Sequence, residues 1–437
     1  MRCPREGRGC GRVTAVTERA VARAQDSAGP AMRPHDLPLL DGLRAVAALM
    51  VVGTHVAFQT GAVVNGAWGA VLARFDFGVA LFFVLSGFLL VRPWLAAVTA
   101  GRPGPSTRTY LRRRAARILP AYWLVLLVAL VTTARGTGAT AVLSNVSLLQ
   151  VYTGDLLAGL TQTWSLCTEA AFYLVLPLVA AWLSFRVCSG QMRASAVAAG
   201  LGGLVLVAWC WTGLAAGGIL PVRSSVWLPG HLDWFAVGIG LALVDRSVRD
   251  RPRSLLALRE AEVGRAPWTL LGLAGAAFWL ACTPLGGPAT LAAVAPATAV
   301  LKEALYAVTA GLVLAAVAFA PQRSGSLTRL LGSRVVAALG RISYGIFLWH
   351  LLVLAGVVNL LGVRLFTGSF WRVLALTVAG SVVVATASWL ALERPVLAWA
   401  HRTPLPHRDE LPHRDELPHR APSSPGAAPG SPPTRAG

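Results

Sequence analysis

The residues best suited to chemistry lie in one apolar run, LLDGLRAVAALMVVGTHVAF, which contains Asp41, Arg44 and His55. On a helix, Arg44 and His55 would lie about 20° apart around the axis and about 16 Å apart along it. An imidazole titrates near neutral pH, so His55 could take a proton from an alcohol and later release it. The alternative is a histidine that hydrogen-bonds a neighbouring helix for packing, and this run alone favours neither.

A second group of candidates is the arginine cluster of the segment TYLRRRAARILPAYW, where Arg112, Arg113, Arg114 and Arg117 directly precede an apolar run. Arg114 and Arg117 are three positions apart and share a helix face, so they could bind phosphates by paired hydrogen bonds. Arginine is also typical of the cytoplasmic ends of membrane spans, so topology alone could explain the cluster.

Glu169, in the segment QTWSLCTEAAFYLVLPL, is the acidic candidate and is predicted to open a membrane span. A carboxylate at a helix start is stabilised by the helix dipole, so helix capping is one explanation. A functional carboxylate here could orient a protonated histidine or hold an acceptor hydroxyl. We expect His231 and His350 to be structural. The six cysteines form no CxxC and no Cys/His cluster, so we predict no metal site.

Membrane helices must position these side chains, because the 437-residue chain is 55% hydrophobic and only 13% charged. A typical soluble domain has about 25% charged residues, and a span needs roughly 20 apolar residues. We therefore predict an all-α polytopic membrane protein of about ten transmembrane helices. The predicted spans are 39–58, 76–95, 118–134, 169–187, 195–216, 232–245, 268–285, 301–320, 342–362 and 373–392. The apolar region 287–300 contains Pro288 and Pro296 and could be re-entrant, so nine or eleven spans remain possible.

Arginine also predicts the orientation of the spans. The connections between the second and third spans and between the sixth and seventh are rich in arginine, whereas 136–168 and 286–300 contain no Lys or Arg. Basic loops stay in the cytoplasm, so we expect a multi-pass protein of the plasma membrane with both termini cytoplasmic. The same distribution explains the net charge of +20 without nucleic acid as a partner.

Three regions follow from this pattern: a disordered tail at 1–36, a membrane domain at 37–396, and a disordered tail at 397–437. The second tail repeats the hexapeptide LPHRDE from Leu405 to Glu416. Met32 lies just before the first apolar run, so translation starting there is an alternative that N-terminal sequencing would test.

Taken together, the segments resemble the acyltransferase 3 family of integral membrane O-acyltransferases. The resemblance covers about residues 38–396. It rests on the order of LLDGLRAVAALMVVGTHV, FDFGVALFFVLSGFLL, RRRAARILPAYW, TWSLCTEAAFYLVLP and GRISYGIFLWH, followed by ERP at Glu393–Pro395. The family resemblance makes His55 the expected catalytic residue and adds Arg44, Arg114, Arg117 and Glu169 as site candidates.

The resemblance implies transfer of an acyl group from cytoplasmic acyl-coenzyme A, with acetyl-coenzyme A the expected donor, to a hydroxyl that is usually on a carbohydrate. Arg113, Arg114 and Arg117 would hold the donor's phosphates. His55 would deprotonate the acceptor or carry the acyl group itself. Arg44 would hold the donor or stabilise charge on the thioester oxygen, and Glu169 would position His55 or the sugar.

Family members without an extra extracytoplasmic domain act on cell-envelope polysaccharides, lipid-linked glycans or the sugars of natural products, and we expect this membrane unit to complete the transfer alone. A secondary transporter, an acyl-group translocator and a membrane scaffold are the competing interpretations of the composition. The sequence shows no clear similarity between its two halves, such as many transporters have.

Overall fold

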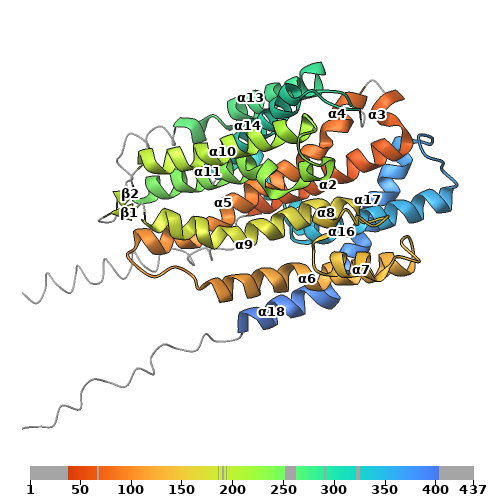
Figure 1. The fold of residues 1–437 in the computed structure, drawn as a ribbon, viewed down its shortest axis with the longest axis horizontal. Helices are drawn as coiled ribbons and strands as arrows, with labels where there is room; N and C mark the ends of the chain where they lie inside the picture. The colour runs from red at the N-terminus through yellow and green to blue at the C-terminus, as the bar shows by residue number, and fades with distance from the viewer. Residues whose placement is uncertain are drawn as a thin grey trace, which may run out of the picture.

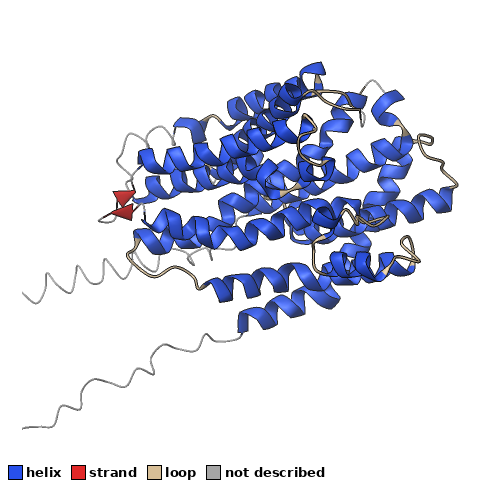
Figure 2. Ribbon diagram, in the orientation of Figure 1, coloured by secondary structure: helices blue, strands red, loops and turns tan. Residues whose placement is uncertain are grey.

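The computed structural model is a bundle of long helices (Figure 1), and helices dominate throughout (Figure 2). The structure describes residues 38–65, 68–185, 187–188, 191–192, 194–250, 262–289, 292–320 and 325–402. The long helices are α2 (Pro38–Thr60), α5 (Phe77–Thr99), α6 (Thr107–Val131), α9 (Trp164–Phe185), α10 (Ala194–Ala216), α11 (Leu232–Asp250), α13 (Pro267–Cys282), α14 (Pro296–Ala318), α16 (Arg334–Leu361) and α17 (Phe370–Ser388).

Short elements connect these helices. They are α3 (Ala62–Asn65), α4 (Gly69–Ala73), η1 (Arg74–Asp76), α7 (Ala139–Val146), α8 (Gln150–Thr153), η2 (Thr161–Thr163), β1 (Val187–Cys188), β2 (Gln191–Met192), η3 (Val222–Val226), η4 (Leu228–His231), η5 (Pro284–Gly286), α15 (Ser326–Leu331), the π-helical turn η6 (Trp389–Glu393) and α18 (Arg394–Arg402). The strands β1 and β2 form one small antiparallel ladder.

Each of the ten predicted spans coincides with a long helix, which confirms the all-α membrane architecture. Within the described residues, eight helical segments are long and apolar enough to cross a membrane. The other two predicted spans are α13, which is shorter, and α11. In the region 287–300, α14 already begins at Pro296, and the described residues before it form no separate span.

Four helices begin five or more residues before the predicted spans. Two of them are α14, which begins at Pro296 rather than 301, and α16, which begins at Arg334 rather than 342. The helix α6 begins at Thr107 rather than 118, and α9 begins at Trp164 rather than 169. The predicted domain boundary at 396 lies inside α18, which continues to Arg402. Residues 1–37 and 403–437, where the two tails are predicted, lie outside the described part of the chain.

Close backbone contacts hold the centre of the bundle together. A Cβ added to Gly238 of α11 would lie 2.1 Å from the carbonyl oxygen of Val84 in α5, and one added to Gly340 of α16 would lie 2.1 Å from that of Asp41 in α2. Such approaches are typical of membrane helices, which associate by packing small residues closely. These two glycines therefore fix α11 against α5 and α16 against α2.

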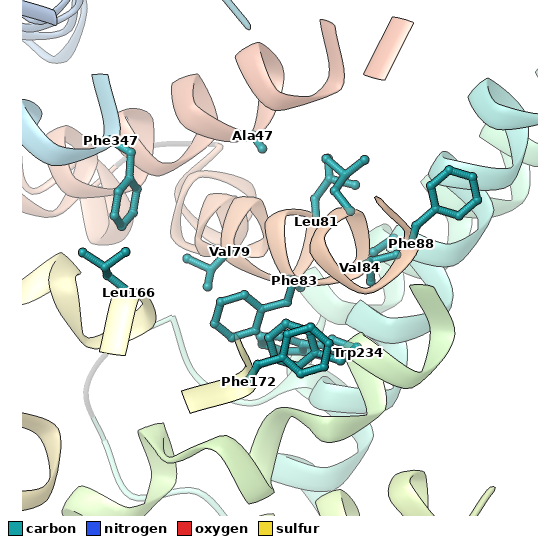
Figure 3. Close-up of a cluster of buried hydrophobic side chains, with 14 of the residues drawn as sticks. Ala47, Val79, Leu81, Phe83, Val84, Phe88, Leu166, Phe172, Trp234 and Phe347 are labelled. Carbon is teal, nitrogen blue, oxygen red and sulfur yellow. The ribbon is translucent and has the colours of Figure 1, made fainter. Parts of the chain in front are cut away.

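Aromatic side chains fill the core beside these contacts (Figure 3). The ring of Phe235 stacks on Phe83 and on Phe172, with ring centroids 4.7 and 3.8 Å apart respectively. All three rings are buried, and stacked pairs add to the energy gained from buried area. This cluster joins α5, α9 and α11, the helices that support one wall of the site described below.

The chain places its arginine-rich connections at one end of the bundle. We call this the arginine-rich end: α5 ends there at Thr99 and α6 begins there at Thr107. The helix α11 also ends there, as an ion pair of 3.2 Å between Arg92, near the end of α5, and Asp245, in the last turns of α11, shows. The first helix, α2, begins at this end and α18 runs toward it (Figure 1).

Candidate active site

A cavity of about 100 Å³ lies among α2, α5, α6, α9 and α16. That volume would hold several water molecules. Its lining residues are Arg44, Phe82, Phe83, Ser86, Leu89, Leu90, Arg114, Arg117, Ile118, Ser165, Leu166, Glu169, Tyr173, Ser343, Tyr344 and Phe347. Four of the six site residues expected from the sequence therefore meet in one cavity, although they come from three different helices.

The early start of α6 puts the arginines into the bundle. Ser106 caps the helix, since its hydroxyl accepts a hydrogen bond from the backbone N–H of Thr109. Arg114 and Arg117 are then one turn apart on the helical face that lines the cavity. Arg113 lies on the exposed side of α6 and does not line the cavity. The helical register thus separates Arg113 from the two arginines with which it was grouped.

Arg117 is held between aromatic rings. Its guanidinium carbon lies 5.8 Å from the ring centroid of Tyr344 and 5.5 Å from that of Trp389. Glu393 is buried nearby and interacts with Arg117 electrostatically. Trp389 and Glu393 belong to the π-helical turn η6, a kind of turn that is frequent at functional sites.

Arg44 supplies the third cationic group from α2. Its guanidinium forms an ion pair of 3.2 Å with Asp41, one turn earlier. Both side chains keep partial exposure, 35% for Arg44 and 25% for Asp41. A pair of this exposure contributes little to stability, so Arg44 remains able to bind an anionic group that enters the cavity.

Glu169 is the acidic group of the cavity. Because α9 begins at Trp164, Glu169 lies beyond the first turn, and helix capping no longer explains it. Its carboxylate accepts hydrogen bonds from the hydroxyls of Ser86, at 2.5 Å, and Tyr173, at 2.7 Å. With three arginines and one carboxylate, the charged lining is positive overall.

His55 does not line the cavity but pairs with a second histidine. Its Nδ1 lies 2.8 Å from the carbonyl oxygen of Val51 and 3.3 Å from Nε2 of His350 in α16. His350 is fully buried, whereas His55 keeps partial exposure. In the described part of the chain, no hydrogen bond joins Glu169 to His55, so the expected orientation of His55 by Glu169 is not observed.

One aromatic residue connects the cavity with the histidine pair. Phe347 lines the cavity opposite Leu166 (Figure 3), and its ring centroid is 6.0 Å from that of His350. Phe82 also lines the cavity, and its ring centroid lies 6.1 Å from that of Phe347. Phe347 therefore lies next to both the cavity and the histidine pair.

Sequence reasoning missed several residues of this site. Ser86 interrupts the apolar run FDFGVALFFVLSGFLL, and Tyr173 follows Glu169 at one helical turn, so both carried a local signal. We expect His350 to be structural from the sequence, and the structure places its ring against that of His55. Among the described residues, no group of three or more His, Cys, Asp or Glu side chains could hold a metal ion.

Comparisons with known proteins agree with this architecture. The family model described as an acyltransferase domain, Acyl_transf_3, matches residues 37–392. The chain is 35% identical to "Acyltransferase MdmB" of Streptomyces mycarofaciens over 156 residues, which cover 32% of this chain and 38% of that protein. It is 26% identical to "Putative peptidoglycan O-acetyltransferase YrhL" of Bacillus subtilis (strain 168) over 401 residues, 84% of this chain and 56% of that protein.

The matched regions therefore span 38% and 56% of the lengths of these two relatives. No solved structure matches the chain. The family model, in contrast, extends from the start of α2 into η6 and includes every helix that lines the cavity. The chain belongs to the acyltransferase 3 family of integral membrane proteins.

Proposed function

We propose that this protein transfers an acyl group from acyl-coenzyme A to a hydroxyl of a carbohydrate or glycosylated acceptor. The observation that carries the proposal is the cavity in which Arg44, Arg114 and Arg117 face Glu169. Cationic groups inside a membrane bundle are costly and are typical of substrate sites. The histidine pair beyond Phe347 supplies the only further group this chemistry requires, a base.

We propose that different parts of the donor bind in different places. About 100 Å³ is too small for a whole coenzyme A, so only the thioester end would enter. Arg114 and Arg117 would then hold the end of the donor inside the bundle, while its nucleotide phosphates would remain at the mouth, where Arg113 is exposed. A small acyl group such as acetyl fits this volume, which supports acetyl-coenzyme A as the donor.

The proposed reaction uses the cavity and the histidine pair in sequence. Nε2 of His55 takes the proton of the acceptor hydroxyl, and the oxygen attacks the thioester carbonyl. Arg44 lies about 16 Å from His55 along the axis of α2, so it would hold the donor in the cavity rather than contact the reacting carbonyl. The thiolate then leaves and receives the proton from His55, so the histidine returns to its neutral form. An acyl group carried briefly by His55 is the alternative route.

The proposed acceptor rests on a relative, and the proposed orientation rests on charge. The name of the Bacillus relative points to a cell-wall polysaccharide, and a glycolipid or a natural-product sugar would present the same hydroxyl chemistry. By the positive-inside rule, the arginine-rich end faces the cytoplasm, where acyl-coenzyme A is found. Both ends of the chain would then be cytoplasmic, in the plasma membrane.

A transfer assay on purified protein in lipid nanodiscs tests the proposal. Labelled acetyl-coenzyme A and longer acyl donors are supplied with a panel of sugars, glycolipids and glycosylated natural products, with His55→Ala alongside. We expect label in an acceptor for the native chain and none for the variant. Absence of transfer, donor hydrolysis and donor binding would contradict the proposal and favour a transporter.

A further inference from the structure

Two histidines from distant parts of the chain meet in the bundle. His55 lies in α2 and His350 in α16, and their ring centroids are 5.0 Å apart at an angle of 56°. The two helices run side by side from their first turns, where Gly340 approaches the backbone of Asp41. The ring contact is therefore fixed by helix packing over a long stretch rather than by a flexible loop.

Backbone carbonyls decide where the protons of both rings lie. Nδ1 of His350 is 2.7 Å from the carbonyl oxygen of Phe347, and Nδ1 of His55 is 2.8 Å from that of Val51. A carbonyl oxygen only accepts hydrogen bonds, so in each neutral ring Nδ1 carries the proton. It follows that Nε2 of His350 has a free lone pair.

This lone pair faces His55. Nε2 of His350 lies 3.3 Å from Nδ1 of His55, so the N–H of His55 is shared between His350 and the carbonyl of Val51. Nε2 of His55 is left unprotonated, and among the described residues it has no hydrogen-bond partner. Within the same residues, no carboxylate comes close enough to either ring to form an ion pair.

We infer that His350 is a positioning residue for the reaction of His55. By accepting the Nδ1–H bond, His350 holds the imidazole with its basic Nε2 available to the acceptor hydroxyl. When Nε2 takes that proton, the positive charge strengthens the bond to His350, which stabilises the imidazolium. This role, filled by a carboxylate in Ser-His-Asp sites, belongs here to a second imidazole. The inference rests on the proposed function.

Two conservative variants separate positioning from packing. In His350→Gln, the amide oxygen can reach the place of Nε2 and accept the bond from His55. In His350→Asn, the shorter amide can still donate to the carbonyl of Phe347 but leaves the place of Nε2 empty. The two variants therefore differ mainly in the acceptor that the inference requires.

We expect His350→Asn to lower kcat on the order of ten- to a hundredfold, the loss of one hydrogen bond to a charged group, with KM for acyl-coenzyme A unchanged. His350→Gln should retain most of the activity, and both variants should unfold at similar temperatures. Full activity in His350→Asn, or equal losses in both variants that follow their unfolding temperatures, would overturn the inference.

Solid-state NMR of the whole protein, labelled with ¹⁵N-histidine in bilayers, tests the pairing without an activity assay. The signal of His55 is identified by its loss in His55→Ala. We expect the Nδ1–H form of His55, with a nitrogen–nitrogen coupling that disappears in His350→Asn. An Nε2–H form would overturn the inference. A chain that shows the coupling but transfers no acyl group would contradict the proposed function and confirm the pairing.

Discussion

Replacement of Arg117 by alanine should weaken the binding of the acyl donor and also lower the stability of the fold. Arg117 lines the cavity and lies over the rings of Tyr344 and Trp389. In the proposed reaction its guanidinium binds the donor, and a hydrogen bond to a charged group contributes about 1.5–3 kcal/mol. KM for acyl-coenzyme A should therefore rise roughly 10- to 100-fold, with a smaller change in kcat.

The same replacement also removes two cation–π contacts, each worth about 0.5–2 kcal/mol. Arg117→Lys distinguishes the two effects, because it keeps the charge but loses the planar group that stacks on both rings and donates paired hydrogen bonds. We expect Arg117→Lys to have an intermediate KM. Arg108→Ala removes the same charge from an exposed position near the start of α6 and serves as the control for topology.

The assay is donor titration of the purified variants in nanodiscs, with thermal unfolding and protease mapping of the loops measured on the same samples. A lowered unfolding temperature with an unchanged KM would refute the role in donor binding and leave Arg117 as a packing residue. An inverted topology in Arg117→Ala, but not in Arg108→Ala, would instead assign the arginine to membrane orientation.

Three further predictions concern the other parts of the site and its support. His55→Ala should lower kcat by roughly 10²–10⁴-fold, the usual contribution of a general base, while membrane insertion stays unchanged; retained transfer would remove His55 from the mechanism. Glu169→Gln weakens two charge-assisted hydrogen bonds by about 1 kcal/mol each, so kcat should fall roughly 10- to 30-fold. If the variant and the native chain were equally active at saturating donor, this role of Glu169 would be wrong. Gly238→Ala should destabilise the fold by about 1–3 kcal/mol, because the new Cβ meets the backbone of Val84. The control is Gly272→Ala, where nothing lies within 4 Å of the new Cβ. Equal unfolding temperatures of the two variants would contradict this prediction.

The sequence predicts the helices well because an apolar run long enough to span a bilayer has few other stable structures. It fails at the starts of helices that extend beyond the apolar region. The polar first three turns of α6 carry the arginine cluster, so hydropathy places the helix start at 118 although the helix begins at Thr107. Ser106, a residue type that often caps helices, was the signal in the sequence that could have marked this earlier start. With the helix beginning after Ser106, the arginines lie inside the helix rather than before it.

Spacing in the sequence places site residues together only where they share one helix. Arg114 and Arg117 could be placed on one face from their spacing, and they do line the cavity together. The contact between Glu169 and Ser86 and the pairing of His55 with His350 depend on how α5 meets α9 and how α2 meets α16. Helix periodicity contains no information about such neighbours, so the positioning histidine could not be found from a single sequence.

The helices that line the cavity differ in how easily they can move. Glycine contacts bring the backbones of α2, α5, α11 and α16 together, and helices without side chains between them have little freedom to slide. The most apolar stretch of the span containing α5 is 67% buried, but that of α6 is only 33% buried. Entry of a bulky donor should therefore displace α6 outward, against the surrounding lipid. KM values for the proposed reaction should accordingly vary with the thickness and lateral pressure of the bilayer, so the lipid would influence its kinetics.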